Sequence, residues 1–211
     1  DSKMWVIGGG TRNDVWYSTS GSSWTQSTAN AQWAARDLHT SLVFDSKMWV
    51  IGGDEGVANV CNAGAGNVCN DVWYSTSGSS WTQSTANAQW AARQTHTSLV
   101  FDSKMWVIGG TTGGVQNDVW YSTAGSTWTQ STAAAQWAAR DNHTSLVFNS
   151  QMWVSGGASS TTQFNDVWYS GGAQWLVDHQ GTEDITYANI SNSGCAATST
   201  DIDVNNSTDG G

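Results

Sequence analysis

Hydrophobic and polar positions along the chain form short runs that are typical of β-strands. Runs of about six residues rich in Val, Ile, Thr, Trp and Tyr (HTSLVF, MWVIGG, DVWYST and SSWTQST) alternate with turn sequences such as Asp-Ser and Ser-Gly-Ser. No stretch keeps the 3.6-residue apolar period of a helix, and alanine-rich linkers such as residues 29–36 are too short for stable helices by themselves. The MWVI runs are apolar on both faces, which predicts sheets packed between two neighbours.

The same runs recur in a fixed order. DSKMWVIGG begins at residues 1, 45 and 102 and returns as NSQMWVSGG at 149; NDVWYS begins at 13, 70, 117 and 165; HTSLVF begins at 39, 96 and 143. The connection between Gly-Gly and NDVWY has 3, 16, 6 and 7 residues in the successive copies. A constant framework with one variable loop is typical of stacked repeats. Four short strands in each unit of about 50 residues predict a β-propeller with about four blades present.

The order R-x-x-H-T-S-L-V-F, M-W-V-I-G-G, N-D-V-W-Y and a further Trp resembles the kelch repeat over residues 1–175, especially the Trp-rich kelch-like repeats of secreted microbial proteins. The resemblance implies an all-β, kelch-type propeller. One departure is that AQWAAR stands where a kelch linker usually carries proline before its arginine.

Both ends of the repeat region are irregular. No R-x-x-H-T-S strand precedes Met4, so we expect an incomplete first blade whose missing strand comes from the tail, from another chain or from upstream residues. The blades would then belong to a larger propeller or be closed by another chain. Residues 176–211 contain six acidic residues and no Lys or Arg. We expect this acidic segment to be a closing strand with a frayed end, or the opening of the Ig-like repeat that it resembles.

Charge limits the classes of partner. Seven Lys and Arg against 17 Asp and Glu give a formal charge of −10, which does not favour nucleic acid or an anionic membrane surface. No apolar run reaches the ~18 residues that a bilayer span needs. We expect neither a nucleic-acid partner nor membrane insertion.

Arginine, histidine and aspartate recur together, which invites an acid–base interpretation. Each set occupies an equivalent place in its repeat, however, whereas catalysis normally needs one asymmetric group of residues. We therefore expect no catalytic residue and a structural role between blades, which the kelch resemblance also implies. The residues are Arg36, His39, Arg93, His96, Arg140, His143, Asp14, Asp71, Asp118 and Asp166.

The sixteen-residue connection contains Cys61 and Cys69 in a Gly-rich sequence. We expect a disulfide, and hence an oxidising compartment; a metal pair is the alternative, but no nearby His or further Cys completes a zinc set. Cys195 is left over, free or paired elsewhere. Glycosylation sequons at Asn189, Asn205 and Asn206 fit a secreted chain.

Candidate binding residues lie in this connection and in the AQW linkers. The connection is unique and acidic through Asp54 and Glu55, and loops on a rigid scaffold often carry function. Trp33, Trp90 and Trp137 either stack on sugar rings at the rim or cover the gaps between blades. No cofactor is expected, except that the alternating oxygen side chains of residues 201–209 suggest a calcium loop as the alternative to a solvated acidic tail.

These features predict a non-catalytic extracellular or cell-surface propeller that binds another protein or a glycan. The alternative is a structural subunit of an extracellular filament or coat, because head-to-tail contacts that do not close give fibres. A carbohydrate-active enzyme is the third hypothesis, since kelch-like propellers include copper oxidases and sialidase relatives. It is disfavoured because the tyrosines and histidines are mostly the repeated ones.

Overall fold

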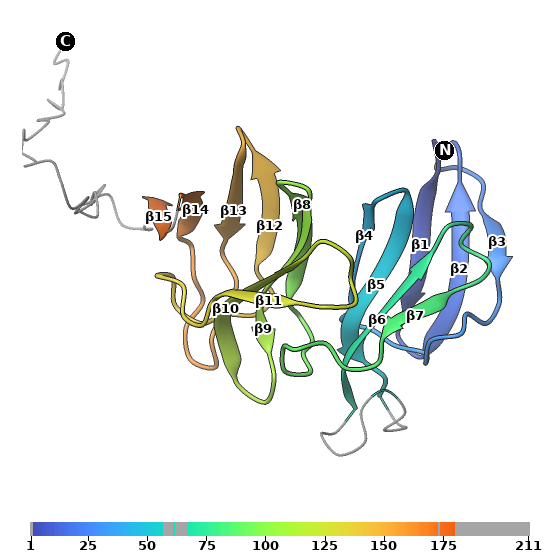
Figure 1. The fold of residues 1–211 in the computed structure, drawn as a ribbon, viewed down its shortest axis with the longest axis horizontal. Coiled ribbons are helices and arrows are strands. Elements are labelled where there is room, and N and C mark those ends of the chain that lie inside the picture. Colours follow the sequence, from blue (N-terminus) through green and yellow to red (C-terminus); the bar gives the residue numbers. More distant parts are fainter. Residues whose placement is uncertain (1, 57–60, 62–66, 173, 180–211) are drawn as a thin grey trace, which may run out of the picture.

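The computed structural model describes residues 2–56, 61, 67–172 and 174–179. This part of the chain forms 15 strands and no helix, and hence no helix long and apolar enough to cross a membrane. The strands make four antiparallel sheets that follow one another in chain order (Figure 1). The all-β class predicted from the sequence is confirmed.

Each sheet corresponds to one sequence repeat. Sheet 1 contains β1 (Met4–Gly9), β2 (Arg12–Ser18) and β3 (Thr25–Thr28). Sheet 2 contains β4 (Thr40–Phe44), β5 (Lys47–Asp54), β6 (Val68–Ser75) and β7 (Thr82–Thr85). Sheet 3 contains β8 (Thr97–Phe101), β9 (Lys104–Thr111), β10 (Val115–Ser122) and β11 (Thr129–Thr132). Sheet 4 contains β12 (Thr144–Phe148), β13 (Gln151–Ser155), β14 (Val167–Gly171) and β15 (Gln174–His179).

The Asp-Ser and Asn-Ser pairs close the first hairpin of sheets 2, 3 and 4. Asp45 and Ser46 both have positive φ, at 49° and 56°, as a two-residue hairpin turn of the primed type requires. The turn sets the register in which Phe44 pairs with Lys47 and Thr40 with Ile51. Sheet 1 has no strand equivalent to β4, β8 or β12 among the described residues, in keeping with its incomplete repeat.

The hydrophobic cores lie between consecutive sheets rather than inside any one of them. In β5 all four residues of the MWVI run are buried, because Met48 and Val50 face sheet 1 whereas Trp49 and Ile51 face sheet 3. The same division recurs at the next junction, where Trp106 and Ile108 of β9 pack on β13. Strand β4 contacts β8, and β8 contacts β12, so these strands are the innermost of their sheets. The arrangement is compatible with propeller blades.

The last sheet extends past the boundary expected at residue 175. Strand β15 pairs with β14 through Leu176 opposite Tyr169 and Val177 opposite Trp168. Residues 174–179 therefore complete sheet 4, although their sequence, QWLVDH, differs from the TQST of the other outer strands.

The second glycine of each Gly-Gly pair in sheets 2 to 4 permits a close approach of the segment that leads into the innermost strand of the same sheet. Gly110 has φ of 93°, and a Cβ at this position would lie 2.6 Å from the Cβ of His96. Gly113, in the connection that follows, has the same φ of 93° but no atom within 4 Å of its Cβ position. Substitution of Gly113 therefore tests the backbone conformation alone, whereas substitution of Gly110 tests the backbone conformation and the packing together.

We expect Gly113→Ala to lower the free energy of unfolding by about 1 kcal/mol, the conformational cost of a left-handed alanine. Gly110→Ala should cost about 1 to 3 kcal/mol more, because its methyl group meets His96. Urea denaturation of both variants measures the difference. Equal losses would contradict the packing role of Gly110.

Candidate functional site

A buried arginine precedes the innermost strand of sheets 2, 3 and 4. The guanidinium of Arg36 donates two hydrogen bonds to the Asp71 carboxylate, at 2.6 and 2.9 Å, and a third to the Gly52 carbonyl at 3.0 Å. Arg93 with Asp118, and Arg140 with Asp166, repeat this geometry. All three arginines are fully buried, as is tolerable for a charge only when it is paired and hydrogen-bonded.

Each of these arginines connects two sheets. The backbone of Arg36 is bonded to sheet 1, where its N–H donates to the Arg12 carbonyl and its carbonyl accepts from the Gly9 N–H. Its side chain is bonded to sheet 2. Arg93 and Arg140 make the equivalent bonds at the next two junctions. The guanidinium therefore has the same structural role at all three junctions between consecutive sheets in the described part of the chain: it holds one sheet to the next.

Asp118 and Asp166 are held in their charged form. Burial raises the pKa of Asp118, but the hydrogen bonds and charge of Arg93, together with a bond from the Trp120 indole, lower it more, and the pKa ends below its ordinary 3.8. The same balance, with Arg140 and Trp168, lowers the pKa of Asp166. A carboxylate in this state is a poor proton donor or acceptor near neutral pH.

The histidines are held in their neutral form. The Nε2 atoms of His96 and His143 lie 3.0 and 2.9 Å from the hydroxyls of Thr40 and Thr97 in the preceding sheet. Burial, followed by the charge of the neighbouring arginine, lowers the pKa of His39 and of His143 to about 4. Burial and the Arg93 charge also lower the pKa of His96 well below 6.5. Their Nδ1 atoms are buried with no hydrogen-bond partner, so protonation there would be unfavourable.

The linker tryptophans are buried between sheets. Trp33, Trp90 and Trp137 are each 1% exposed. Each makes an edge-to-face contact with the tryptophan at the start of the outermost strand of the next sheet, at 5.9 to 6.2 Å between ring centroids. We call these partners the marker tryptophans; they are Trp81, Trp128 and Trp175. Each ring also lies 5.7 to 6.0 Å from the guanidinium carbon of its neighbouring arginine. A sugar at the rim cannot reach these indoles, so their positions fit the covering role and not the binding role.

Repeated amide side chains also link the sheets, which the sequence analysis missed. The Gln32, Gln89 and Gln136 side chains accept hydrogen bonds at 2.6, 2.6 and 2.8 Å from the backbone N–H of the next marker tryptophan. The NDVWY asparagine Asn13 donates to the Ala31 and Trp33 carbonyls, and Asn70 and Asn117 do the same in their repeats. These glutamines and asparagines could have been found from the sequence, because they recur in every AQW linker and every NDVWY run.

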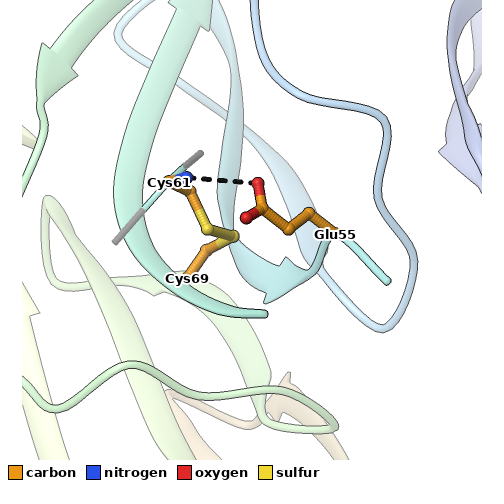
Figure 2. Close-up of side chains that lie close together, drawn as sticks. All are labelled: Glu55, Cys61 and Cys69. Atoms are coloured by element: carbon orange, nitrogen blue, oxygen red, sulfur yellow. Dashed lines mark hydrogen bonds between the residues drawn. A yellow bond between two sulfur atoms is a disulfide. The ribbon is translucent and has the colours of Figure 1, made fainter. Parts of the chain in front are cut away.

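The non-repeated feature of the described residues is the connection between β5 and β6. It contains the predicted Cys61–Cys69 disulfide, and the Glu55 carboxylate accepts a hydrogen bond from the Cys61 backbone N–H at 3.1 Å (Figure 2). Glu55 is only 4% exposed and points back toward the disulfide, whereas Asp54 is half-buried and accepts a bond from the Gly56 N–H. The acidic pair therefore stabilises the connection locally.

The same three side chains have the spacing of a metal site. A Glu55 carboxylate oxygen and the two sulfur atoms lie within 4.8 Å of one another. Metals bind cysteine as the thiolate, however, and both sulfurs are used in the disulfide. The arrangement is a stapled connection and not a metal centre.

Several predicted features lie outside the described residues. These are Cys195, the sequons at Asn189, Asn205 and Asn206, and the proposed calcium loop, which comprises Asp201, Asp203, Asn205, Ser207 and Asp209.

The buried histidines predict a loss of stability in mild acid. Because their pKa values fall from 6.5 in the unfolded chain to about 4 for His39 and His143, the unfolded state binds more protons between these limits, and stability falls as pH falls through this window. We expect a loss of about 2 kcal/mol for each such histidine between pH 7 and 5. Asp118 and Asp166 titrate below this range, since their pKa values lie under 3.8.

Urea denaturation at pH 7 and pH 5 measures this loss. His143→Gln should make the loss smaller by the contribution of one histidine, about 2 kcal/mol. A free energy of unfolding that is the same at pH 7 and pH 5 would show that the histidines are not held neutral.

Comparison with known proteins assigns no family to this chain: no family model matches it, and no curated protein matches it either.

Proposed function

We propose that the chain forms blades of a kelch-type β-propeller that works outside the cell as a non-catalytic module binding another protein or a glycan. The observation that carries the proposal is the contrast between the repeated polar residues and the single stapled connection. Arg36, Arg93 and Arg140 are fully buried in inter-sheet contacts, so they are not offered to a substrate. The β5–β6 connection, by contrast, has no counterpart of its length in the other sheets.

The geometry of the connection supports a binding role. It begins and ends on paired strand residues, with Asp54 opposite Val68, so a rigid sheet supports it at both ends. The disulfide ties Cys61 to Cys69 of β6, and a cross-link of this kind lowers the conformational entropy that binding must overcome. A disulfide also fits an oxidising compartment such as the extracellular space.

Sheet 3 provides a natural replacement for this connection. Val115 pairs with Thr111 as Val68 pairs with Asp54, and only Thr112, Gly113 and Gly114 lie between them. A graft that replaces residues 55–67 by this tripeptide, with Cys69→Gln to match Gln116, removes the connection and keeps the sheet.

We expect the graft to keep the thermal stability and far-ultraviolet spectrum of the parent chain but to lose binding on a glycan array and to purified extracellular proteins. The matched control changes exposed residues in the connection of sheet 4, Ser160→Ala with Thr161→Ala, and should bind like the parent. Unchanged binding by the graft would exclude the connection as the binding site.

A structural subunit is the second candidate, favoured by the exposed faces at the two ends of the row of sheets (Figure 1). Met4 and Val6 on sheet 1 are both 47% exposed, although their counterparts in the other sheets are buried against a neighbour. Phe148 on sheet 4 is 66% exposed, although Phe101 packs into a core. This candidate requires the pure chain to assemble end to end, as electron microscopy would show.

A further inference from the structure

We propose that the open edge of β1 binds an extended segment of another polypeptide with the pattern R-x-x-H-T-S-L-V-F. The segment would pair with β1, its arginine would reach the Asp14 carboxylate and the Gly8 carbonyl, and its threonine would reach His39. This site is separate from the β5–β6 connection, so the proposal can be tested independently of ligand binding at that connection.

The first observation concerns strand pairing. Strands β5, β9 and β13 each pair with an innermost strand on one side and with a middle strand on the other, whereas β1 pairs with β2 alone among the described strands. Residues 4–7 carry the same MWVI sequence as residues 48–51, which pair with β4. An open edge of unpaired backbone groups is the structure to which an added strand binds.

The second observation is that sheet 1 has the hydrogen-bond acceptors that hold the arginine in the other sheets but, in the described part of the chain, no arginine bound to them. In sheets 2 to 4 the NDVWY aspartate and the first glycine carbonyl of the Gly-Gly pair hold one guanidinium, as Asp71 and Gly52 hold Arg36. The equivalent residues of sheet 1 are Asp14 and Gly8. Asp14 accepts the Trp16 indole N–H at 2.9 Å, as its counterparts accept theirs, but no arginine of the described residues pairs with it. The carboxylate is half-buried and matches a positive charge.

The third observation concerns His39. His96 and His143 contact a threonine of the preceding innermost strand and are only 4% and 6% exposed. His39 contacts the Ile7 carbonyl, at 3.1 Å, as His96 and His143 contact Ile51 and Ile108, but no threonine of the described residues contacts His39, and it is less buried. A threonine on a strand added to β1 would occupy the corresponding position.

The fourth observation is a groove beside β1. It has a volume of about 240 Å³ and is lined by Lys3, Trp5, Ile7, Ser41, Leu42, Val43 and Met48, from β1 and its approach and from β4 and β5. Because β4 lies next to β8, and β8 next to β12, a strand added to β1 would lie next to β4, along this groove. Its apolar residues would then cover Val43, which is 65% exposed.

The chemistry of the occupant follows from these contacts, and burial excludes a second folded copy of the described sheets as its source. The chain has three segments of this pattern, and each is already paired in its own sheet with a fully buried arginine. A second folded copy therefore offers none of them without breaking a buried ion pair. A separate polypeptide that presents the pattern in extended form meets no such obstacle.

The test uses a capped peptide of residues 34–44, AARDLHTSLVF, fluorescently labelled and titrated with the full chain. We expect saturable binding with one peptide per chain. Arg→Gln in the peptide should weaken binding about tenfold or more, because the half-buried Asp14 would lose its partner. Asp14→Asn in the chain should have a similar effect, while Asp45→Asn, which changes an exposed carboxylate, should have none.

Three results would overturn the proposal. One is no binding to the folded chain at millimolar peptide. Another is binding that is indifferent both to Asp14→Asn and to the peptide arginine, since this would be non-specific apolar contact. The third is association of the chain with itself, detected by sedimentation, that the peptide does not compete. The peptide variant is tested on the unaltered chain, so it remains informative even if Asp14→Asn does not fold.

Discussion

The buried arginine between consecutive sheets is the interaction on which the rest of the structure depends. Its backbone is bonded to one sheet and its guanidinium to the next, as Arg93 shows with Cys69 on one side and Asp118 on the other. A charge removed from water is strongly unfavourable unless its partners are in place, so this contact fixes both the order of the sheets and their separation. The linker tryptophan then covers the ion pair, and the neutral histidine packs against it.

Local sequence information was sufficient for the sheets themselves. Strand runs, two-residue turns such as Asp45-Ser46, and the four-strand repeat could all be predicted because side-chain alternation and turn chemistry act over a few residues. The length of the last strand of sheet 4 could not, because in QWLVDH only Trp175 continues the repeat signal and the strand is defined by its pairing with β14. The bulges at the Gly-Gly pairs likewise depend on the neighbouring sheet.

The candidate site was only partly predictable, for a related reason. Two cysteines eight residues apart in a Gly-rich connection predict the disulfide, but nothing local predicts that Glu55 turns inward to accept the Cys61 N–H. Trp33 could equally have faced a ligand or a neighbour, and only the presence of Trp81 in the next sheet decides. The open edge of β1 could be identified as a binding site only from the structure, because the arginines bound to Asp71, Asp118 and Asp166 show which partner Asp14 lacks among the described residues.

The central claim is that the buried arginine and aspartate act as one unit joining consecutive sheets. A double-mutant cycle with Arg93→Met and Asp118→Asn, followed by urea denaturation, tests it most directly. Each single change should cost about 3 to 5 kcal/mol, and the double variant clearly less than the sum, because each removes the other's partner. Costs below about 1 kcal/mol that simply add, as expected for the exposed Lys104–Asp102 pair, would contradict the claim.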